Sequence, residues 1–284
     1  MPKGDLAVVT MVFNEPDMLP IWREYYGKAV GFENCYIVDH ASTDLSTLDI
    51  APFNVIRIPR SPLDDVARAK FLSGICSALL TWFHAVAYTD VDEILVPDPE
   101  RYPDLPSYAR AAPHDVTTAF GMDVVQVENE APLDPRRPIL SQRHYVWPFS
   151  SLCKPTLIRR PVNWSAGFHY ADAATEFDDL LLFHLAYADY DIIRRRQRKR
   201  RSTPRVSEGG EHHDFAEDEM VRRFRTISEL PRLDDADLRQ ESACRREFSG
   251  RLFANQLRLG EHLVIGSGGS EALWRIPERF RDCF

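Results

Sequence analysis

The first residues of the chain switch from an apolar run to a segment with helical spacing. Residues 6–13 (LAVVTMVF) are almost entirely apolar, which is typical of a strand buried on both faces of a parallel sheet. Pro16 then suits the first turn of a helix. The apolar residues that follow recur at helical spacing and give that helix one apolar face: Met18, Trp22, Tyr25 and Ala29.

The same alternation continues to about residue 90. A long helix is predicted at residues 64–83, and further strands are predicted at residues 35–38, 54–58 and 85–89. Strands separated by helices predict right-handed βαβ units and a mostly parallel, Rossmann-like sheet flanked by helices. The fold class is therefore α/β.

The rest of the chain is less regular. The expected elements are a short helix within residues 97–113, strands at 116–127, 152–158 and 168–170, and a long polar loop at 128–147. An apolar run at residues 180–190 leads into a basic run, and the sequence from about residue 214 is mainly helical and charged. We expect one α/β domain at 1–190, divided into halves at 1–100 and 101–190, with a helical C-terminal region at 191–284 packed on it.

Composition narrows the class of protein. The chain has 284 residues, of which 44% are hydrophobic, so it can bury a sizeable core. Its formal net charge of −8 argues against a nucleic-acid binder, which needs a basic face. The longest apolar run is far short of the ~20 residues of a membrane span, and no signal peptide is recognisable. Five scattered cysteines without a CxxC pair are typical of free thiols, so we expect a cytoplasmic protein.

Polar residues follow the predicted strands where each strand ends. In open α/β sheets, ligands bind outside the carboxyl ends of the strands, so these side chains are expected to converge on one crevice. The residues are Asn14 and Glu15 after the first strand, Asp39, Ser42 and Asp44 after the second, and Asp90 and Asp92 after the fourth.

The sequence Asp90-Val91-Asp92 is the strongest chemical signal. A pair of carboxylates on a short turn supplies the hard oxygen ligands that Mn²⁺ or Mg²⁺ prefers. Such a metal stabilises a departing diphosphate as a Lewis acid. Because apolar segments lie on both sides of this pair, we favour a metal and diphosphate site over a solvated turn at a strand end.

Two segments resemble the nucleotide-binding half of GT-A glycosyltransferases, in particular the family-2-like and family-92-like branches. They are TMVFNEPDMLPIWREYYGKAVGFENCYIVDHASTD and YTDVDEILV. The resemblance covers roughly residues 6–100 well and continues more weakly to about residue 190. It implies a nucleotide-sugar donor, a D-x-D metal site and the GT-A fold.

Carried over to this sequence, the resemblance gives roles to individual residues. Asp39 would accept hydrogen bonds from the base or ribose of the donor, with Asn14 and Glu15 shaping the same pocket. Asp92 would ligate the metal directly, and Asp90 would face the ribose or the water shell of the metal. A simpler alternative stays open, in which Asn14 and Glu15 cap the next helix and Asp39 stabilises a turn.

Two histidines are candidates for a further metal ligand, which GT-A enzymes often take from their second half. His184 lies inside an apolar run, where its ring needs a partner, and His169 is the second candidate. A satisfied core histidine is an equally good interpretation of His184. The pair His212 and His213 looks like an exposed polar turn.

Inverting transfer also needs a general base for the acceptor hydroxyl. Six carboxylates lie in the middle region, and no spacing rule selects among them: Asp123, Glu128, Glu130, Asp172, Glu176 and Asp178. Asp172, close to His169, and Glu128, at a strand end, are the candidates, although a solvated surface carboxylate is the simpler interpretation of each.

Cations offer a second way to hold a diphosphate. Lys154, at the start of a predicted strand, is expected to bind the donor. The basic run from Arg194 to Arg201 could hold an anionic ligand or contact a membrane surface peripherally. Because its charges point all round a helix, a solvated helix face is the interpretation we favour for the run.

These observations together predict a metal-dependent glycosyltransferase. It would move a sugar from a nucleotide-sugar donor, a UDP-sugar by preference, to a glycan or lipid-linked glycan acceptor, with inversion implied by the resemblance. One alternative is a nucleotidyltransferase, although that class usually has a Gly-rich phosphate loop where Asn14-Glu15-Pro16 stands here. The other is a non-catalytic nucleotide- or glycan-binding protein on a transferase scaffold.

Overall fold

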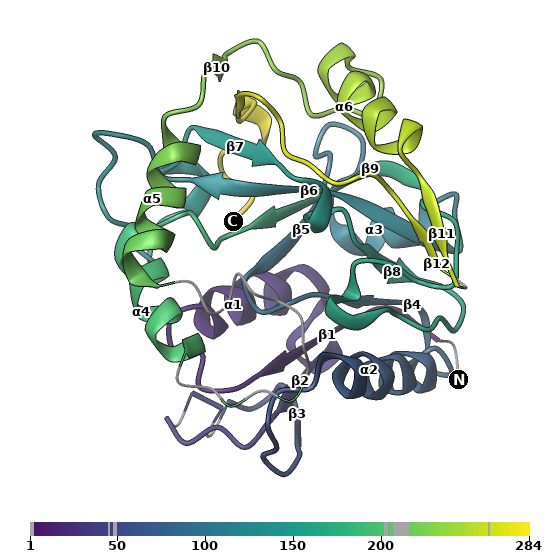
Figure 1. The fold of residues 1–284 in the computed structure, drawn as a ribbon. Helices are drawn as coiled ribbons and strands as arrows, with labels where there is room; N and C mark the ends of the chain where they lie inside the picture. The colour runs from purple at the N-terminus through teal and green to yellow at the C-terminus, as the bar shows by residue number, and fades with distance from the viewer. Residues whose placement is uncertain are drawn as a thin grey trace.

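The computed structural model describes residues 3–44, 46–47, 50–201, 204, 206, 216–260 and 262–284. Strands and helices alternate along the first third of the chain (Figure 1). The helices are α1 (Leu19–Val30), α2 (Asp65–Leu79), α3 (Leu105–Ala111), α4 (Tyr190–Arg201), α5 (Glu217–Ser228) and α6 (Ala243–Ala254). The strands of the first half are β1 (Gly4–Val12), β2 (Cys35–Asp39), β3 (Asn54–Arg57), β4 (Phe83–Tyr88) and β5 (Glu93–Pro97). The later ones are β6 (Val116–Val125), β7 (Tyr145–Pro148), β8 (Pro155–Ile158), β9 (Phe177–His184), β10 (Arg232–Leu233), β11 (Leu257–Leu259), β12 (His262–Val264) and β13 (Leu273–Arg275).

The sheet begins with four parallel strands in the order β3-β2-β1-β4. This confirms the α/β class and the parallel βαβ arrangement. Alternate residues of β1 pack into different cores: Leu6 and Val8 face one side of the sheet, and Ala7 and Val9 face the other. Burial on both faces is therefore the physical reason for the unbroken apolar run at the start of the chain.

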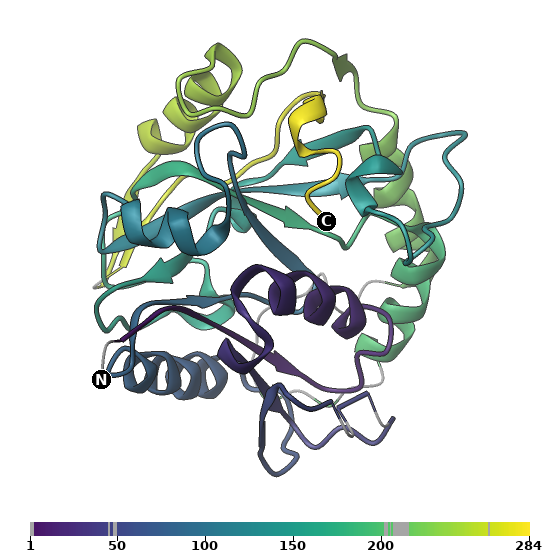
Figure 2. The ribbon, with the colours of Figure 1, turned by 180° about the vertical axis from the view of Figure 1, so that it is seen from behind.

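Helices cover both faces of these strands. Trp22 and Tyr26 of α1 and Tyr108 of α3 pack on the face of Leu6 and Val8. Ala69, Leu72 and Cys76 of α2 pack on the opposite face. Figure 1 shows α2 in front of the sheet, and Figure 2, from behind, shows α1 in front.

Beyond β4 the sheet becomes mixed. β8 joins β4 antiparallel, β6 joins β8 antiparallel, and β9 lies parallel to β6 and antiparallel to β5. β5 and β9 are fully or almost fully buried, and the sequence pattern alone did not separate them from other apolar runs. The strand predicted at residues 168–170 is wrong, because η4 (Ala166–Phe168) is a turn of 3-10 helix that contains Gly167 at φ 72°.

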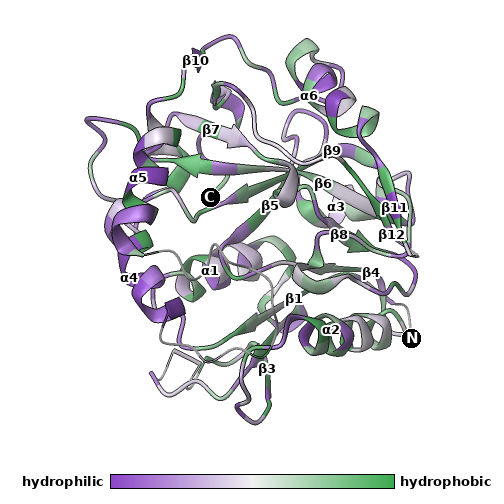
Figure 3. Ribbon diagram, in the orientation of Figure 1, coloured by the Kyte–Doolittle hydropathy of each residue, from purple (hydrophilic) through white to green (hydrophobic). Residues whose placement is uncertain are grey.

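The C-terminal region contains α5 and α6, as predicted, but also short strands. β13 pairs with β7, and β10 pairs with β13, so this region extends the main sheet. Trp274 of β13 stacks on Phe120 of β6 with ring centroids 6.0 Å apart. α4 and α5 pack together at the left edge of Figure 1, and Figure 3 shows that α4 is strongly hydrophilic. Among the described residues, no helix is both long enough and apolar enough to cross a membrane.

Candidate active site

Asp90 and Asp92 lie in the turn that joins β4 to β5. Thr89, at the start of this turn, is fully buried, and its hydroxyl accepts a hydrogen bond from Trp22 Nε1 at 2.9 Å. Val91 points into the core, which holds the two aspartates at the carboxyl ends of the parallel strands. Asp92 and the next residue, Glu93, are only 3% and 1% exposed. Carboxylates this deeply buried need partners.

The partners of Asp90 come from β4, α2 and the start of β8. Its Oδ1 accepts hydrogen bonds from Arg68 and, at 2.9 Å, from the hydroxyl of Tyr88. Its Oδ2 accepts one from Lys154 Nζ at 2.8 Å. The antiparallel register of β4 and β8 determines the position of Lys154. Ala87 pairs with Leu157, and the same register extended by three residues brings Lys154 opposite Asp90.

Lys154 also pairs with a second carboxylate. Its Nζ lies 2.6 Å from Glu93 Oε1, while Glu93 Oε2 accepts a hydrogen bond from the backbone N of Asp90 at 2.9 Å. Burial alone would lower the pKa of Lys154, but Asp90 and Glu93 outweigh it and raise that pKa. Burial would raise the pKa of Asp90, but Lys154 and Arg68 outweigh it and lower that pKa. The charged groups on this side are therefore held in place by one another.

The partners of Asp92 come from β9 and α4. Asp92 Oδ2 lies 3.2 Å from His184 Nε2 and 3.8 Å from Arg200 Nη2, and it accepts a hydrogen bond from Arg196. The other ring nitrogen of His184, Nδ1, lies 2.6 Å from Asp123 Oδ1. Strand register explains this contact, because His184 of β9 lies between Glu93 of β5 and Asp123 of β6.

Two carboxylates beside His184 favour its protonated, cationic form. Burial would lower its pKa, but the carboxylates of Asp92 and Asp123 outweigh burial and raise it to about 10. Burial would raise the pKa of Asp92, but Arg196 and His184 outweigh burial and hold it well below its ordinary value. Both ring nitrogens of His184 lie within 3.2 Å of a carboxylate oxygen, and a ring protonated on both nitrogens has no lone pair for a metal.

α4 closes the site from the other side. Lys199 Nζ lies 2.6 Å from Glu15 Oε1 and donates to the backbone oxygen of Asn14. Arg196 Nε lies 3.4 Å from Glu15 Oε2, yet it makes no hydrogen bond although it is buried. Burial and the neighbouring charge of Arg196 lower the pKa of Arg200. The helix therefore presents three cations to the carboxylates Glu15 and Asp92.

The structure corrects our interpretation of the basic run. The solvated-face interpretation holds for Arg194 and Arg198, which pair with Glu217 of α5, and for Arg195, which pairs with Asp17 on the surface. It is wrong for Arg196, which is only 8% exposed and contacts Asp92.

Asn14 and Asp39 connect the loops that follow β1 and β2. Asn14 has a φ of 52°, and its Oδ1 accepts hydrogen bonds from the backbone N of Thr43 at 2.7 Å and of Asp44 at 3.2 Å. Asp39 is 1% exposed and accepts from the backbone N of Ser42 and the hydroxyl of Thr47 at 2.7 and 2.9 Å. Neither Asn14 nor Glu15 caps α1, whose N-cap, Met18, makes no side-chain bond. The turn interpretation of Asp39 matches its described contacts.

His169 lies on the side of Asp90. It follows Phe168, whose ring stacks on Tyr88 at 4.1 Å and lies 5.0 Å from the guanidinium of Arg68. His169 Nδ1 lies 2.8 Å from the backbone oxygen of Ser151, which places the proton on that nitrogen. Burial and Lys154 lower the pKa of His169, which favours the neutral ring.

The two candidates for the general base are not brought to this cluster. Asp172 accepts hydrogen bonds from Asn163 N and Nδ2, both at 2.9 Å, in an exposed loop. Glu128 is exposed in the turn after β6. Neither contacts a residue of the cluster in the described part of the chain. His212 and His213 lie outside the described residues.

Among the described residues, six charged contributors to the cluster were not selected individually from the sequence: Arg68, Glu93, Asp123, Arg196, Lys199 and Arg200. Asp123 carried a usable signal, because it is the only acidic residue inside the apolar strand predicted at residues 116–127. Glu93 carried a similar signal, because it is a third acidic residue after Asp90 and Asp92 and directly precedes the apolar residues 94–96. Arg68 and Arg196 carried none, since their partners depend on tertiary structure.

The fit of a metal can be judged from these contacts. Mn²⁺ or Mg²⁺ needs carboxylate oxygens that are available to it. Asp90 uses both oxygens on Arg68, Tyr88 and Lys154, and Asp92 Oδ2 is shared among cations. Across the described ranges, no group of three or more His, Cys, Asp or Glu side chains is arranged to hold a metal. Asp92 Oδ1 is the one oxygen of these two aspartates without a cation beside it in the described part of the chain, so in this arrangement the side chains do not fit the metal, and its binding stays a prediction.

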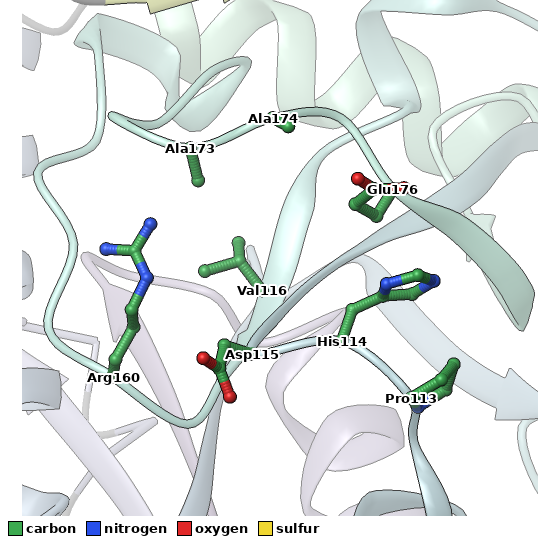
Figure 4. Close-up of a pocket in the computed structure, with 8 residues that line it drawn as sticks. All are labelled: Pro113, His114, Asp115, Val116, Arg160, Ala173, Ala174 and Glu176. Atoms are coloured by element: carbon green, nitrogen blue, oxygen red, sulfur yellow. The ribbon is translucent and has the colours of Figure 1, made fainter.

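The two best-defined pockets lie outside this cluster. One, of about 350 Å³, is lined by residues at the start of α1 and α4, among them Asp17 and Arg195. The other, of about 320 Å³, is shown in Figure 4, where His114, Arg160 and Glu176 surround it. It adjoins Val116 at the start of β6, roughly 23 Å along the strand from Asp123.

Comparisons with known proteins add little. No protein-family model and no curated protein matches the chain. Among solved structures, the chain is similar to a crystal structure of mannose-1-phosphate geranyltransferase from Thermus thermophilus, with 10% identity and a TM-score of 0.29. That match covers 87% of this chain and 68% of the other. A similarity at this TM-score supports no argument about function.

Proposed function

We propose that this protein is a GT-A-type glycosyltransferase. It moves a sugar from a nucleotide-sugar donor, a UDP-sugar by preference, to a glycan or lipid-linked glycan acceptor. The observation that carries the proposal is the convergence of Asp90 and Asp92 with Lys154 and His184 at the carboxyl ends of the parallel strands. That edge of an α/β sheet is where nucleotides bind.

The reaction follows from the chemistry of the donor. The bond between the anomeric carbon and the diphosphate oxygen breaks, and its electron pair stays on that oxygen. The acceptor oxygen forms the new bond from the opposite side, with inversion, and its proton passes to a base. Asp172 and Glu128 stay unsupported predictions for that base. Asp39, Asn14 and Glu15 are proposed to hold the nucleoside, on the resemblance of their segment to GT-A enzymes.

Calorimetry with a panel of UDP-, GDP- and CMP-sugars, with and without Mn²⁺, tests the proposal. We expect one donor to bind and the variant Asp39→Asn, which removes the charge of the carboxylate proposed to hold the nucleoside, to weaken that binding strongly. The surface variant Asp17→Ala, which breaks only the exposed pair with Arg195, is the matched control. Absence of binding by every sugar nucleotide would overturn the proposal.

A second measurement separates the enzyme from its alternatives. Slow hydrolysis of the bound donor to a nucleoside diphosphate and free sugar is expected of a glycosyltransferase. A nucleotidyltransferase would instead join a nucleoside triphosphate to a sugar phosphate and release pyrophosphate. A binding protein would do neither.

A further inference from the structure

We propose that the donor diphosphate binds to cations of the protein itself, which supply the positive charge that D-x-D enzymes take from a metal. The inference rests on the proposed function and specifies which groups of the site bind the diphosphate. The cation site is defined by residues of α4, α2 and the start of β8: Arg196, Lys199, Arg200, Arg68 and Lys154.

The α4 part of this site has an excess of positive charge. Arg196, Lys199 and Arg200 are three and four residues apart, so they share one face of the helix. Among the described residues, the ion pairs of these three side chains are with two carboxylates, Glu15 and Asp92, and Asp92 also pairs with His184. Like charges at this spacing repel each other. An added anion would relieve that repulsion.

Two guanidinium nitrogens of this face make no hydrogen bond in the described part of the chain. Arg196 Nε is buried without a hydrogen bond, and its 3.4 Å separation from Glu15 is long for one. Arg200 Nη2 lies 3.8 Å from Asp92, beyond hydrogen-bond distance. Guanidinium groups bind phosphate oxygens in pairs, so both arginines suit a diphosphate.

The β8 part of the site pairs with the other aspartate of the D-x-D turn. Lys154 is buried, charged and fixed between Asp90 and Glu93. Preorganised cations of this kind stabilise negative charge as it develops on a leaving group. Arg68 donates a hydrogen bond to the other carboxylate oxygen of Asp90, Oδ1. Phosphate oxygens can replace carboxylate oxygens as partners of all these groups.

The same ion pairs oppose a metal. Each aspartate of Asp90-Val91-Asp92 already faces at least two cationic side chains, namely Arg68 and Lys154 or Arg196 and His184. A divalent ion entering here would be placed beside those charges, at a large electrostatic cost. An anion would not.

Binding of inorganic pyrophosphate in EDTA tests the inference by calorimetry on the full chain. Pyrophosphate should bind without added metal, and Arg200→Gln should weaken it about 10-fold or more, as expected for one charge-assisted hydrogen bond. Arg200→Lys should restore part of the affinity. Arg198→Gln is the matched control, since Arg198 lies on the same helix and pairs with Glu217 instead.

The outcomes separate this inference from the proposed function. Pyrophosphate and a sugar nucleotide that bind only when Mn²⁺ is present would overturn the cation site and leave the glycosyltransferase standing. Binding in EDTA that Arg200→Gln and Arg198→Gln leave equally strong would also overturn it. Pyrophosphate binding in EDTA without any sugar-nucleotide binding would support the cation site and overturn the glycosyltransferase.

Discussion

Asp90 and Asp92 are separated by one residue, yet their counterions come from different parts of the chain. Asp90 is paired by Arg68 and Lys154, which lie on α2 and at the start of β8, directly against the parallel strands. Asp92 is paired by His184 of β9 and by arginines of α4, which lies at the edge of the molecule. One half of the site is thus part of the central sheet, and the other is completed by a peripheral helix.

This difference bears on how a ligand enters. The Asp90 side cannot open without moving the sheet itself. The Asp92 side opens if α4 shifts away from Glu15 and Asp92. A donor is therefore expected to enter on the α4 side, while the Asp90 side keeps its geometry.

The comparison is tested most strongly at Lys154. Lys154→Met leaves Asp90 and Glu93 buried without this shared cation, so we expect a loss of about 3–5 kcal/mol in unfolding free energy. Urea denaturation measures the loss, and Lys70→Met, at an exposed position of α2, is the control. If Lys154→Met lost no more unfolding free energy than the control, the ion pairs of Lys154 would not hold the Asp90 side in place.

The next largest effect is the pH dependence that His184 brings. The pKa of His184 is raised from 6.5 to about 10, so the stability it contributes is complete below pH 6.5 and is lost as pH rises through about 10. The unfolding free energy should fall by up to about 1.4 kcal/mol per pH unit in that window. His184→Gln should remove this slope when urea denaturation is repeated from pH 6 to 10, and an unchanged slope contradicts the assignment.

Removal of one α4 cation should cost less than removal of Lys154. In Arg196→Gln, His184 and Arg200 remain beside Asp92, and we expect a loss of about 1–3 kcal/mol. The same urea experiment compares the two variants directly. If Arg196→Gln lost as much unfolding free energy as Lys154→Met, the Asp90 side would not be held more firmly than the Asp92 side.

Tyr88→Phe gives the smallest expected change. It removes one hydrogen bond to Asp90 Oδ1 and leaves Arg68 on that oxygen, so about 1 kcal/mol should be lost. Pyrophosphate affinity should stay within twofold, because Tyr88 carries no charge. A larger drop in affinity would show that the hydroxyl itself contacts the ligand.

The first half of the fold could be predicted because its signals are local. The apolar run before Asn14 predicted a strand with two buried faces, and β1 packs Val8 and Val9 into different cores. The D-x-D turn was found by its position after such a strand. These features depend on period and on neighbours along the chain, which a single sequence contains.

The ion pairs of the site could not be predicted, because they depend on contacts between distant residues. Eight consecutive polar residues, seven of them basic, have no hydrophobic period, so nothing in Arg194 to Arg201 separates Arg196 from Arg198. Asp172 was selected for its closeness to His169 along the chain, but the loop returns it to Asn163 instead. Spacing along a loop does not determine where a side chain points.

The pairing of β13 with β7 has a consequence for how the chain is made. Translation adds about 5–20 residues per second, so roughly 6–25 s pass between synthesis of Pro148 and of Arg275. During that time β7 has no partner on one edge, and the place of Trp274 against Phe120 is empty. An unpaired strand edge is a template for pairing with other chains. Slow translation of the last segment would therefore expose the nascent protein to aggregation before its sheet is complete.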